Sequence, residues 1–84
     1  MTKQEVIDAI HYLYFKQKEE EIGNLKLESY YEEGDWQIVV FPVGDEDWEN
    51  ARLYCYYYYS PDDFQVNTPE QMYNWIANDF DWKF

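Results

Sequence analysis

The segment LKLESYYEEGDWQIVVF, residues 25–41, predicts a β-hairpin around which the other elements can be placed. Apolar and polar residues alternate over Leu25–Tyr31, as in a strand that buries one face. The residues Glu33 to Asp35 predict a turn in which Gly34 takes a positive φ. The run that follows, 36–41, is apolar on both sides and is typical of a strand in the middle of a sheet.

A helix is predicted on the amino-terminal side of this hairpin. Thr2 and Glu5 have the spacing of a capping box, in which each side chain binds the other residue's backbone N–H. Apolar residues then recur with helical spacing, and Gly23 provides a stop, so the helix is expected from about residue 3 to residue 21. The apolar stripe consists of Val6, Ala9, Ile10, Leu13 and Tyr14.

On the carboxyl-terminal side the sequence predicts a charged loop, a third strand and a second helix. The loop covers 45–50, and the strand covers Ala51–Tyr59, which is rich in the aromatic residues that favour sheets. An irregular stretch is expected over 60–67. Thr68 then caps a helix that has Pro69 in its first turn. The buried stripe of this helix is predicted to contain Met72, Trp75, Ile76 and Phe80.

These elements place the chain in the α+β class, as a single domain over residues 1–84. Eighty-four residues are enough for one small core and too few for two. The order α-β-β-β-α has short connections, which predict a three-stranded antiparallel meander. Both helices are expected to cover one face of that sheet.

Charge is the strongest functional signal in the sequence. The chain has eighteen acidic and six basic residues, which gives a net charge of −12. Residues 27–82 hold thirteen of the acids and a single cation, Arg52. Such a field repels nucleic acid and anionic membranes and attracts basic proteins, so neither a nucleic acid nor a membrane is expected as a direct partner. Solubility is the alternative interpretation of an acidic surface.

The run YCYYYYSPDD, residues 54–63, raises the question of what its aromatic rings contact. Strand alternation places Leu53 and Cys55 on one side and Tyr54, Tyr56 and Tyr58 on the other. Leucine and cysteine are usually buried, so the three tyrosines are predicted on the open face of the sheet. There they would stack across strands, form a homodimer, or bind another protein. Stacking on single-stranded nucleic acid needs basic surroundings, which this chain lacks.

Two groups of residues are therefore predicted to bind a basic protein, itself a DNA- or RNA-binding protein. The acidic group lies in the first strand of the hairpin, in turns and loops and at the carboxyl end: Glu28, Glu32, Glu33, Asp35, Asp45, Glu46, Asp47, Glu49, Asp62, Asp63, Asp79 and Asp81. The aromatic group consists of Tyr30, Trp48, Tyr54, Tyr56 and Tyr58.

Catalytic, metal and cofactor sites are not predicted. Asp45, Asp47 and Glu49 have the first spacings of a calcium-binding loop, but Asn50 stands where that loop has glycine and Tyr56 where it has glutamate. The lone histidine is expected to flank the core. The single cysteine, expected to be buried in a strand, is predicted to be inert. The chain is accordingly not expected to be an enzyme.

In size, acidity and element order, the chain resembles the small inhibitors that phages use against host DNA-binding proteins. That class includes anti-CRISPR and anti-restriction proteins, uracil-DNA glycosylase inhibitors and inhibitors of nucleoid proteins. The resemblance carries no shared motif, and it implies a phage-encoded DNA mimic that acts in the cytoplasm. Double-stranded-RNA-binding domains share the element order, but Asp79 and Asp81 replace their basic helix end. An immunity or antitoxin-like protein that masks a basic toxin, and a homodimer with a tyrosine face, are the other hypotheses.

Overall fold

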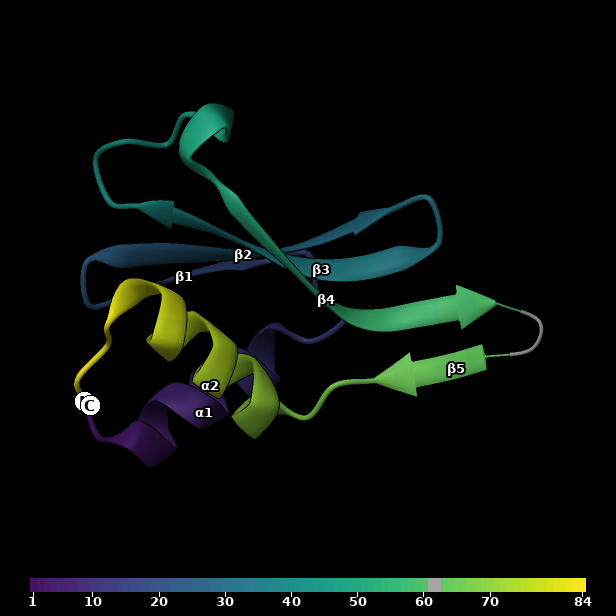
Figure 1. Ribbon diagram of the computed structural model, residues 1–84, viewed down its shortest axis with the longest axis horizontal. Coiled ribbons are helices and arrows are strands. Elements are labelled where there is room, and N and C mark those ends of the chain that lie inside the picture. The colour runs from purple at the N-terminus through teal and green to yellow at the C-terminus, as the bar shows by residue number, and fades with distance from the viewer. Residues whose placement is uncertain (61–62) are drawn as a thin grey trace.

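The protein is an α+β domain in which two helices pack on one face of an antiparallel sheet (Figure 1). The computed structural model describes the backbone of residues 1–60 and 63–84 and the side chains of residues 1–56 and 66–84. The sheet has five strands in the order β1-β2-β3-β4-β5. In chain order the elements are α1 (Lys3–Leu13), β1 (Glu19–Ile22), β2 (Leu25–Glu32), β3 (Asp35–Pro42), the 3₁₀ helix η1 (Trp48–Asn50), β4 (Arg52–Ser60), β5 (Asp63–Val66) and α2 (Pro69–Phe80).

The predicted hairpin is confirmed and forms the middle of the sheet. Strands β2 and β3 pair from Leu25 opposite Pro42 to Glu32 opposite Asp35. The connection is a two-residue turn in which φ is +52° at Glu33 and +86° at Gly34. Two consecutive positive φ values match the right-handed twist of the strands, which is why short hairpins favour this geometry.

Helix α1 begins as predicted but ends earlier than the sequence suggested. The capping box is present, with the Glu5 N–H donating to Thr2 Oγ1 at 3.2 Å and the Thr2 N–H donating to Glu5 Oε1 at 2.9 Å. The helix ends at Leu13, and the expected continuation to residue 21 is wrong. Phe15 takes a left-handed φ of +62°, and its N–H donates to Tyr56 Oη at 2.9 Å. A tertiary contact therefore replaces further helical turns.

Two edge strands were not predicted, so the three-stranded meander is wrong. Residues 19–22 form β1, which pairs with Leu25 to Glu28 of β2, and the glycine at position 23 lies in the turn between them. Four of the residues expected to be irregular, Asp63–Val66, form β5 beside β4. Each edge strand has only four residues and pairs on one side in this sheet, so its own sequence pattern is too short to identify it.

Helix α2 starts where the sequence predicts. Thr68 Oγ1 accepts from the N–H of Gln71 at 3.1 Å, and the Gln71 side chain accepts from the Thr68 N–H at 2.9 Å. The helix ends at Phe80, and the capping residue Asp81 takes the left-handed conformation that often follows a last helical turn. Its buried side chains include Tyr73, whereas Trp75 is exposed, contrary to the predicted stripe.

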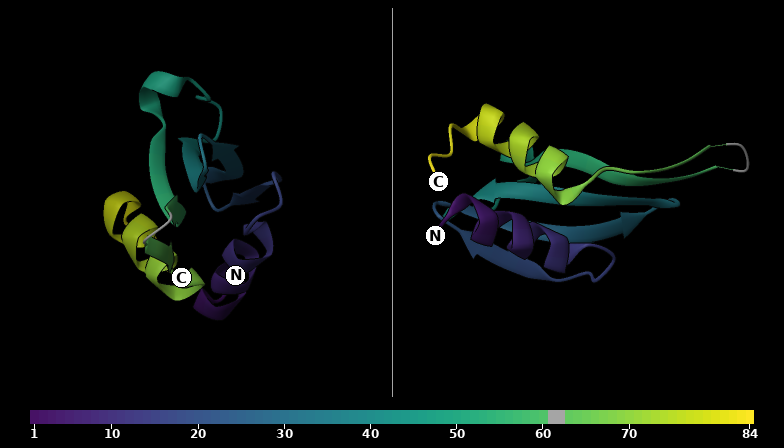
Figure 2. Two further views of the ribbon diagram at one scale, coloured as in Figure 1. Left: turned by 90° about the vertical axis from the view of Figure 1, so that its right-hand side faces the viewer. Right: turned by 90° about the horizontal axis from the view of Figure 1, so that it is seen from below.

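The hydrophobic core lies between the two helices and the face of the sheet that they cover (Figure 2). Helix α1 packs against α2 as well as against the sheet. The buried side chains come from every described layer: Val6, Ile10, Leu13, Tyr14, Ile22, Leu25, Leu27, Ile38, Val40, Tyr54, Tyr56, Met72, Tyr73 and Ile76. The β2–β3 hairpin and the β4–β5 hairpin extend beyond the helices at one end.

Strand β4 alternates as predicted up to Tyr56, beyond which its pairing with β3 shifts register between Trp36 and Gln37, but the predicted assignment of its two faces is wrong. Tyr54 and Tyr56 are buried under the helices, whereas Leu53 is 53% exposed on the other face. Each tyrosine has a hydrogen-bond partner for its hydroxyl: Tyr54 donates to Asp79 Oδ2 at 2.5 Å, and Tyr56 Oη lies 2.7 Å from Ser29 Oγ. A satisfied tyrosine buries more apolar area than leucine or cysteine, which favours this orientation.

Candidate functional site

The candidate site is the face of the sheet opposite the helices, here called the open face, which holds four of the predicted site residues, namely Glu28, Tyr30, Glu32 and Asp35. Strand register determines its members because residues opposite each other in an antiparallel pair share a face. Among the described side chains, these are Glu19, Glu21, Lys26, Glu28, Tyr30, Glu32, Asp35, Gln37, Val39, Phe41, Leu53 and Cys55.

Carboxylates dominate the charge of the open face. Its described acidic side chains are Glu19, Glu21, Glu28, Glu32 and Asp35, and its one described cation is Lys26. The Lys26 ammonium lies 3.0 Å from Glu19 Oε2 and 3.3 Å from Glu46 Oε1. Hydrogen bonds to Glu19 and then to Glu46 raise the pKa of Lys26. This cation therefore stays charged and neutralises neighbours, while the rest of the face remains anionic.

The predicted acidic loop lies on the same side of the sheet. Its 3₁₀ helix is capped by Asp47, whose Oδ1 accepts from the Glu49 N–H at 3.1 Å. The side chain of Asn50 donates to Asp45 Oδ2 at 2.9 Å. These bonds hold the loop in a defined shape, so that Glu46 reaches Lys26 on the open face.

Trp48 attaches this loop to the sheet through aromatic contacts. Its ring centroid is 5.6 Å from that of Phe41 and 6.1 Å from that of Tyr30, both in edge-to-face geometry. Phe41 and Val39 are almost completely buried even though they lie opposite the helices. Trp48 itself is 58% exposed. We call Tyr30, Phe41, Trp48 and Leu53 the Trp48 patch.

Several predicted residues lie away from the open face. Asp79, on α2, accepts the hydrogen bond from Tyr54, and Asp81 forms an exposed ion pair with Lys83 at 3.6 Å. Glu33 occupies the turn at the tip of the β2–β3 hairpin. Asp62 lies outside the described residues, and so do the side chains of Asp63 and Tyr58.

The predicted tyrosine platform on the open face is wrong for Tyr54 and Tyr56. Both are buried, so neither can form a self-associating surface or bind a partner directly. Tyr30 is on the open face as expected, at the edge of the Trp48 patch. Glu19 and Glu21 are open-face residues that were not predicted, because the helical pattern was expected to continue to residue 21, and Leu53 was not predicted there because leucine is usually buried.

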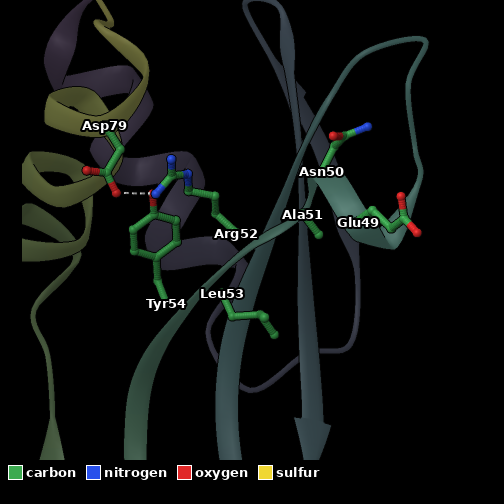
Figure 3. Close-up of a pocket in the computed structure, with 7 residues that line it drawn as sticks. All are labelled: Glu49, Asn50, Ala51, Arg52, Leu53, Tyr54 and Asp79. Carbon is green, nitrogen blue, oxygen red and sulfur yellow. Dashed lines mark hydrogen bonds between the residues drawn. The ribbon is translucent and has the colours of Figure 1, made fainter.

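A cavity of about 490 Å³ lies between β4 and α2 (Figure 3). Its polar groups include the Arg52 guanidinium, the Asp79 carboxylate and the Tyr54 hydroxyl. Burial, and then the hydrogen bond to Asp79, raise the pKa of Tyr54. Arg52 lies over the Phe80 ring, 6.0 Å from its centroid. These contacts link β4 to α2, and we assign the cavity a structural role.

The described side chains contain no group of three potential metal ligands from histidine, cysteine, aspartate and glutamate. Within the same part of the chain, neither helix is long and apolar enough to cross a membrane.

Comparison with known proteins does not assign this chain to a family. No protein-family model, no curated protein and no solved structure matches it. A function must therefore be inferred from the surface itself.

Proposed function

We propose that this protein is a non-enzymatic inhibitor that occupies the basic nucleic-acid-binding surface of another protein, with carboxylates in the place of phosphates. One observation carries the proposal. Four acids of the sheet, Glu19 and Glu21 of β1 and Glu28 and Glu32 of β2, lie on the same side as the acidic 45–49 loop, and the one described cation of the open face, Lys26, is already paired. A cationic surface that approaches this side meets a field of one sign.

The linear density of negative charge on this protein is comparable with that of duplex DNA, which the protein is proposed to displace. Eighteen carboxylates on a molecule 37 Å long amount to roughly one per 2 Å, and the net charge of −12 to roughly one per 3 Å, against one per about 1.7 Å of duplex DNA. The basic groove of a partner would therefore meet a linear density of negative charge of the same order as that of duplex DNA.

The scaffold also supports the proposal because it fixes the positions of these charges. Glu28 and Glu32 lie four residues apart on β2, a spacing of roughly 13 Å along the strand. Glu19 is directly opposite Glu28 on the neighbouring strand, at roughly 5 Å. Like charges opposite each other destabilise a sheet, and Lys26 offsets only part of that cost. Groups held in place before binding lose less conformational entropy when a partner arrives.

The test is competition with DNA. Purified DNA-binding proteins, among them a nucleoid protein, a restriction endonuclease and an RNA-guided nuclease, are loaded with fluorescent duplex, and the protein is titrated in. Displacement of duplex from at least one of them is expected, and it should weaken as salt rises because exposed charges are screened. Displacement from none of them, or binding that ignores salt, would contradict the proposal.

A pair of charge-matched variants makes this test specific to the open face. The first variant combines Glu28→Gln, Glu32→Gln and Asp35→Asn. The control removes three exposed carboxylates from elsewhere, in Asp8→Asn, Glu20→Gln and Glu70→Gln. Both variants change the net charge by the same amount. The open-face variant should lose at least tenfold more affinity than the control, whereas equal losses would show that only total charge matters.

A further inference from the structure

The Trp48 side chain is exposed to solvent and is also held in place by its neighbours. The proposed function does not by itself explain why these two properties occur together. The indole is 58% exposed although two rings, Phe41 and Tyr30, contact it. Both contacts are edge-to-face, so neither ring covers it as a parallel stack. The capped turn of η1 fixes the backbone on which the indole is carried. A large apolar side chain held in solvent on a rigid support is typical of a residue that anchors a partner.

The surroundings of Trp48 determine which partner group fits. Asp47 and Glu49 flank Trp48 in the loop, Glu46 precedes Asp47 and reaches Lys26 on the open face, and Glu28 is two residues from Tyr30 on the same face of β2. A side chain that binds here must offer a flat apolar face to the indole and positive charge to the carboxylates. Arginine meets both needs, because its guanidinium is planar, stacks on aromatic rings and binds carboxylates with two hydrogen bonds. The ammonium of lysine is compact, strongly hydrated and cannot stack.

An arginine of the protein itself already lies over an aromatic ring elsewhere. The Cζ atom of Arg52 is 6.0 Å from the centroid of the Phe80 ring. Tryptophan attracts cations more strongly than either tyrosine or phenylalanine. Leu53, which is 53% exposed next to Val39, extends the apolar surface on which the aliphatic stem of an arginine would rest.

We propose that the Trp48 patch is the docking point for an arginine side chain on the surface of the partner, with Trp48 as the stacking residue and the neighbouring carboxylates as its counter-charges. This inference rests on the proposed function and adds to it the identity of the recognised group. The acidic rim speeds association, and the arginine on Trp48 slows dissociation.

The probes are two peptides of equal length and charge, one built on arginine and one on lysine. The wild-type protein should bind the arginine peptide about three- to tenfold more tightly. Trp48→Ala should remove this preference, mainly through faster dissociation, while Trp48→Phe, which keeps a ring over Phe41, should retain part of it. Trp75→Ala is the matched control, since Trp75 is also exposed, at 45%, but lies on α2. The control should leave the preference intact.

A spectroscopic readout locates the contact and does not depend on whether Trp48→Ala folds. The chain has four tryptophans, so the spectrum of its indole N–H groups is simple to assign with single Trp→Phe variants. Addition of the arginine peptide should shift the Trp48 indole signal more than those of Trp36 and Trp75. The indole N–H of Trp82 is buried and serves as the internal reference.

Each outcome decides one of the two proposals. An arginine preference that survives in both Trp48 variants, or a Trp48 signal that does not move, would overturn the docking point. The DNA-mimic function would still stand if the open-face acids were needed to displace duplex. An arginine preference lost with Trp48→Ala, but without displacement of DNA from any protein, would support the docking point and overturn the function.

Discussion

Tyr56 shows how one residue can organise the centre of this small domain. Its ring is completely buried and stacks on that of Tyr14, with centroids 4.2 Å apart and planes at 12°. Its hydroxyl accepts from the Phe15 N–H and shares a hydrogen bond with Ser29 Oγ. The same side chain therefore joins β4 to β2 and to the chain that leaves α1.

Removal of the Tyr56 hydroxyl should destabilise the fold without leaving a large cavity in the core, because the ring remains. In Tyr56→Phe the Phe15 N–H loses its acceptor and Ser29 loses its partner, at an expected cost of about 1–3 kcal/mol in the free energy of unfolding. Urea denaturation would measure it, with an unchanged m-value. Tyr12→Phe, at an exposed tyrosine, is the control and should stay within about 0.5 kcal/mol of the wild type. Equal effects would show that the buried hydrogen bonds add nothing.

The buried tyrosines also predict how stability depends on pH. Burial raises the pKa of Tyr56, and burial followed by the proximity of Tyr56 raises that of Tyr14, whereas the unfolded chain keeps the usual value near 10. Above that pH the folded state holds more protons than the unfolded state, so the free energy of unfolding should fall as pH rises. Below it, the contribution of these two residues is fully present.

The measurement is urea denaturation at a series of alkaline pH values, followed by tyrosinate absorbance. Tyr14→Phe removes one of the shifted groups, so the free energy of unfolding of this variant should fall less steeply with pH than that of the wild type. A variant with the same slope as the wild type would show that Tyr14 titrates alike in both states.

At the scale of elements, the segment between α1 and β1 decides the size of the sheet. Phe15 and Gln17 both take left-handed φ values, of +62° and +49°. This conformation costs a residue with a side chain roughly 1–2 kcal/mol. The turn it produces brings the Lys18 carbonyl to the Ser29 N–H at 2.8 Å and starts β1 at the edge of β2. Tertiary contacts therefore outweigh the preference for helix that the sequence shows after Leu13.

Replacement of Gln17 by glycine tests this interpretation. Glycine adopts a positive φ without steric cost, and Gln17 is exposed, so Gln17→Gly should increase the free energy of unfolding by up to about 1 kcal/mol. The matched control is Gln4→Gly inside α1, where glycine should decrease it by roughly the same amount. Thermal denaturation of both variants would show the opposite signs. A loss of stability in both would mean that the left-handed turn carries no strain.

At the scale of the whole molecule, the charge that is proposed to serve binding must oppose folding. A net charge of −12 on a body with a radius of gyration of 12.5 Å repels itself, and few described cations are available to offset it. Exposed ion pairs such as Asp81–Lys83 contribute little. The fold therefore tolerates an unfavourable field, which is expected if that field has a use.

Screening should accordingly stabilise the protein. The melting temperature should rise as sodium chloride increases from about 10 mM to about 500 mM, since the Debye length falls well below the size of the molecule. The triple variant Glu28→Gln, Glu32→Gln and Asp35→Asn should melt at a higher temperature in low salt and respond less to salt. A melting temperature that falls with salt would instead show that attractive pairs such as Lys26–Glu19 outweigh the repulsion.

Features that depend on neighbouring residues could be predicted from the amino-acid sequence alone. Capping boxes at Thr2 and Thr68 place both helix starts, and the alternation of Leu25–Tyr31 with a turn at Gly34 gives the central hairpin. Each of these signals acts within a few residues, so no knowledge of the fold is needed to read it. The excess of acidic residues is likewise a property of composition.

Which residues share a surface depends on non-local contacts and could not be predicted from the sequence. The period-two pattern of β4 divides its side chains into two sets but cannot show which set the helices cover, and the partners of Tyr54 and Tyr56 settle that choice. The edge strand β1 exists because β2 offers it a ladder of hydrogen bonds, a non-local contact with no signature in four residues. The composition of the open face, with Trp48 beside its carboxylates, follows from the register in which these strands pair.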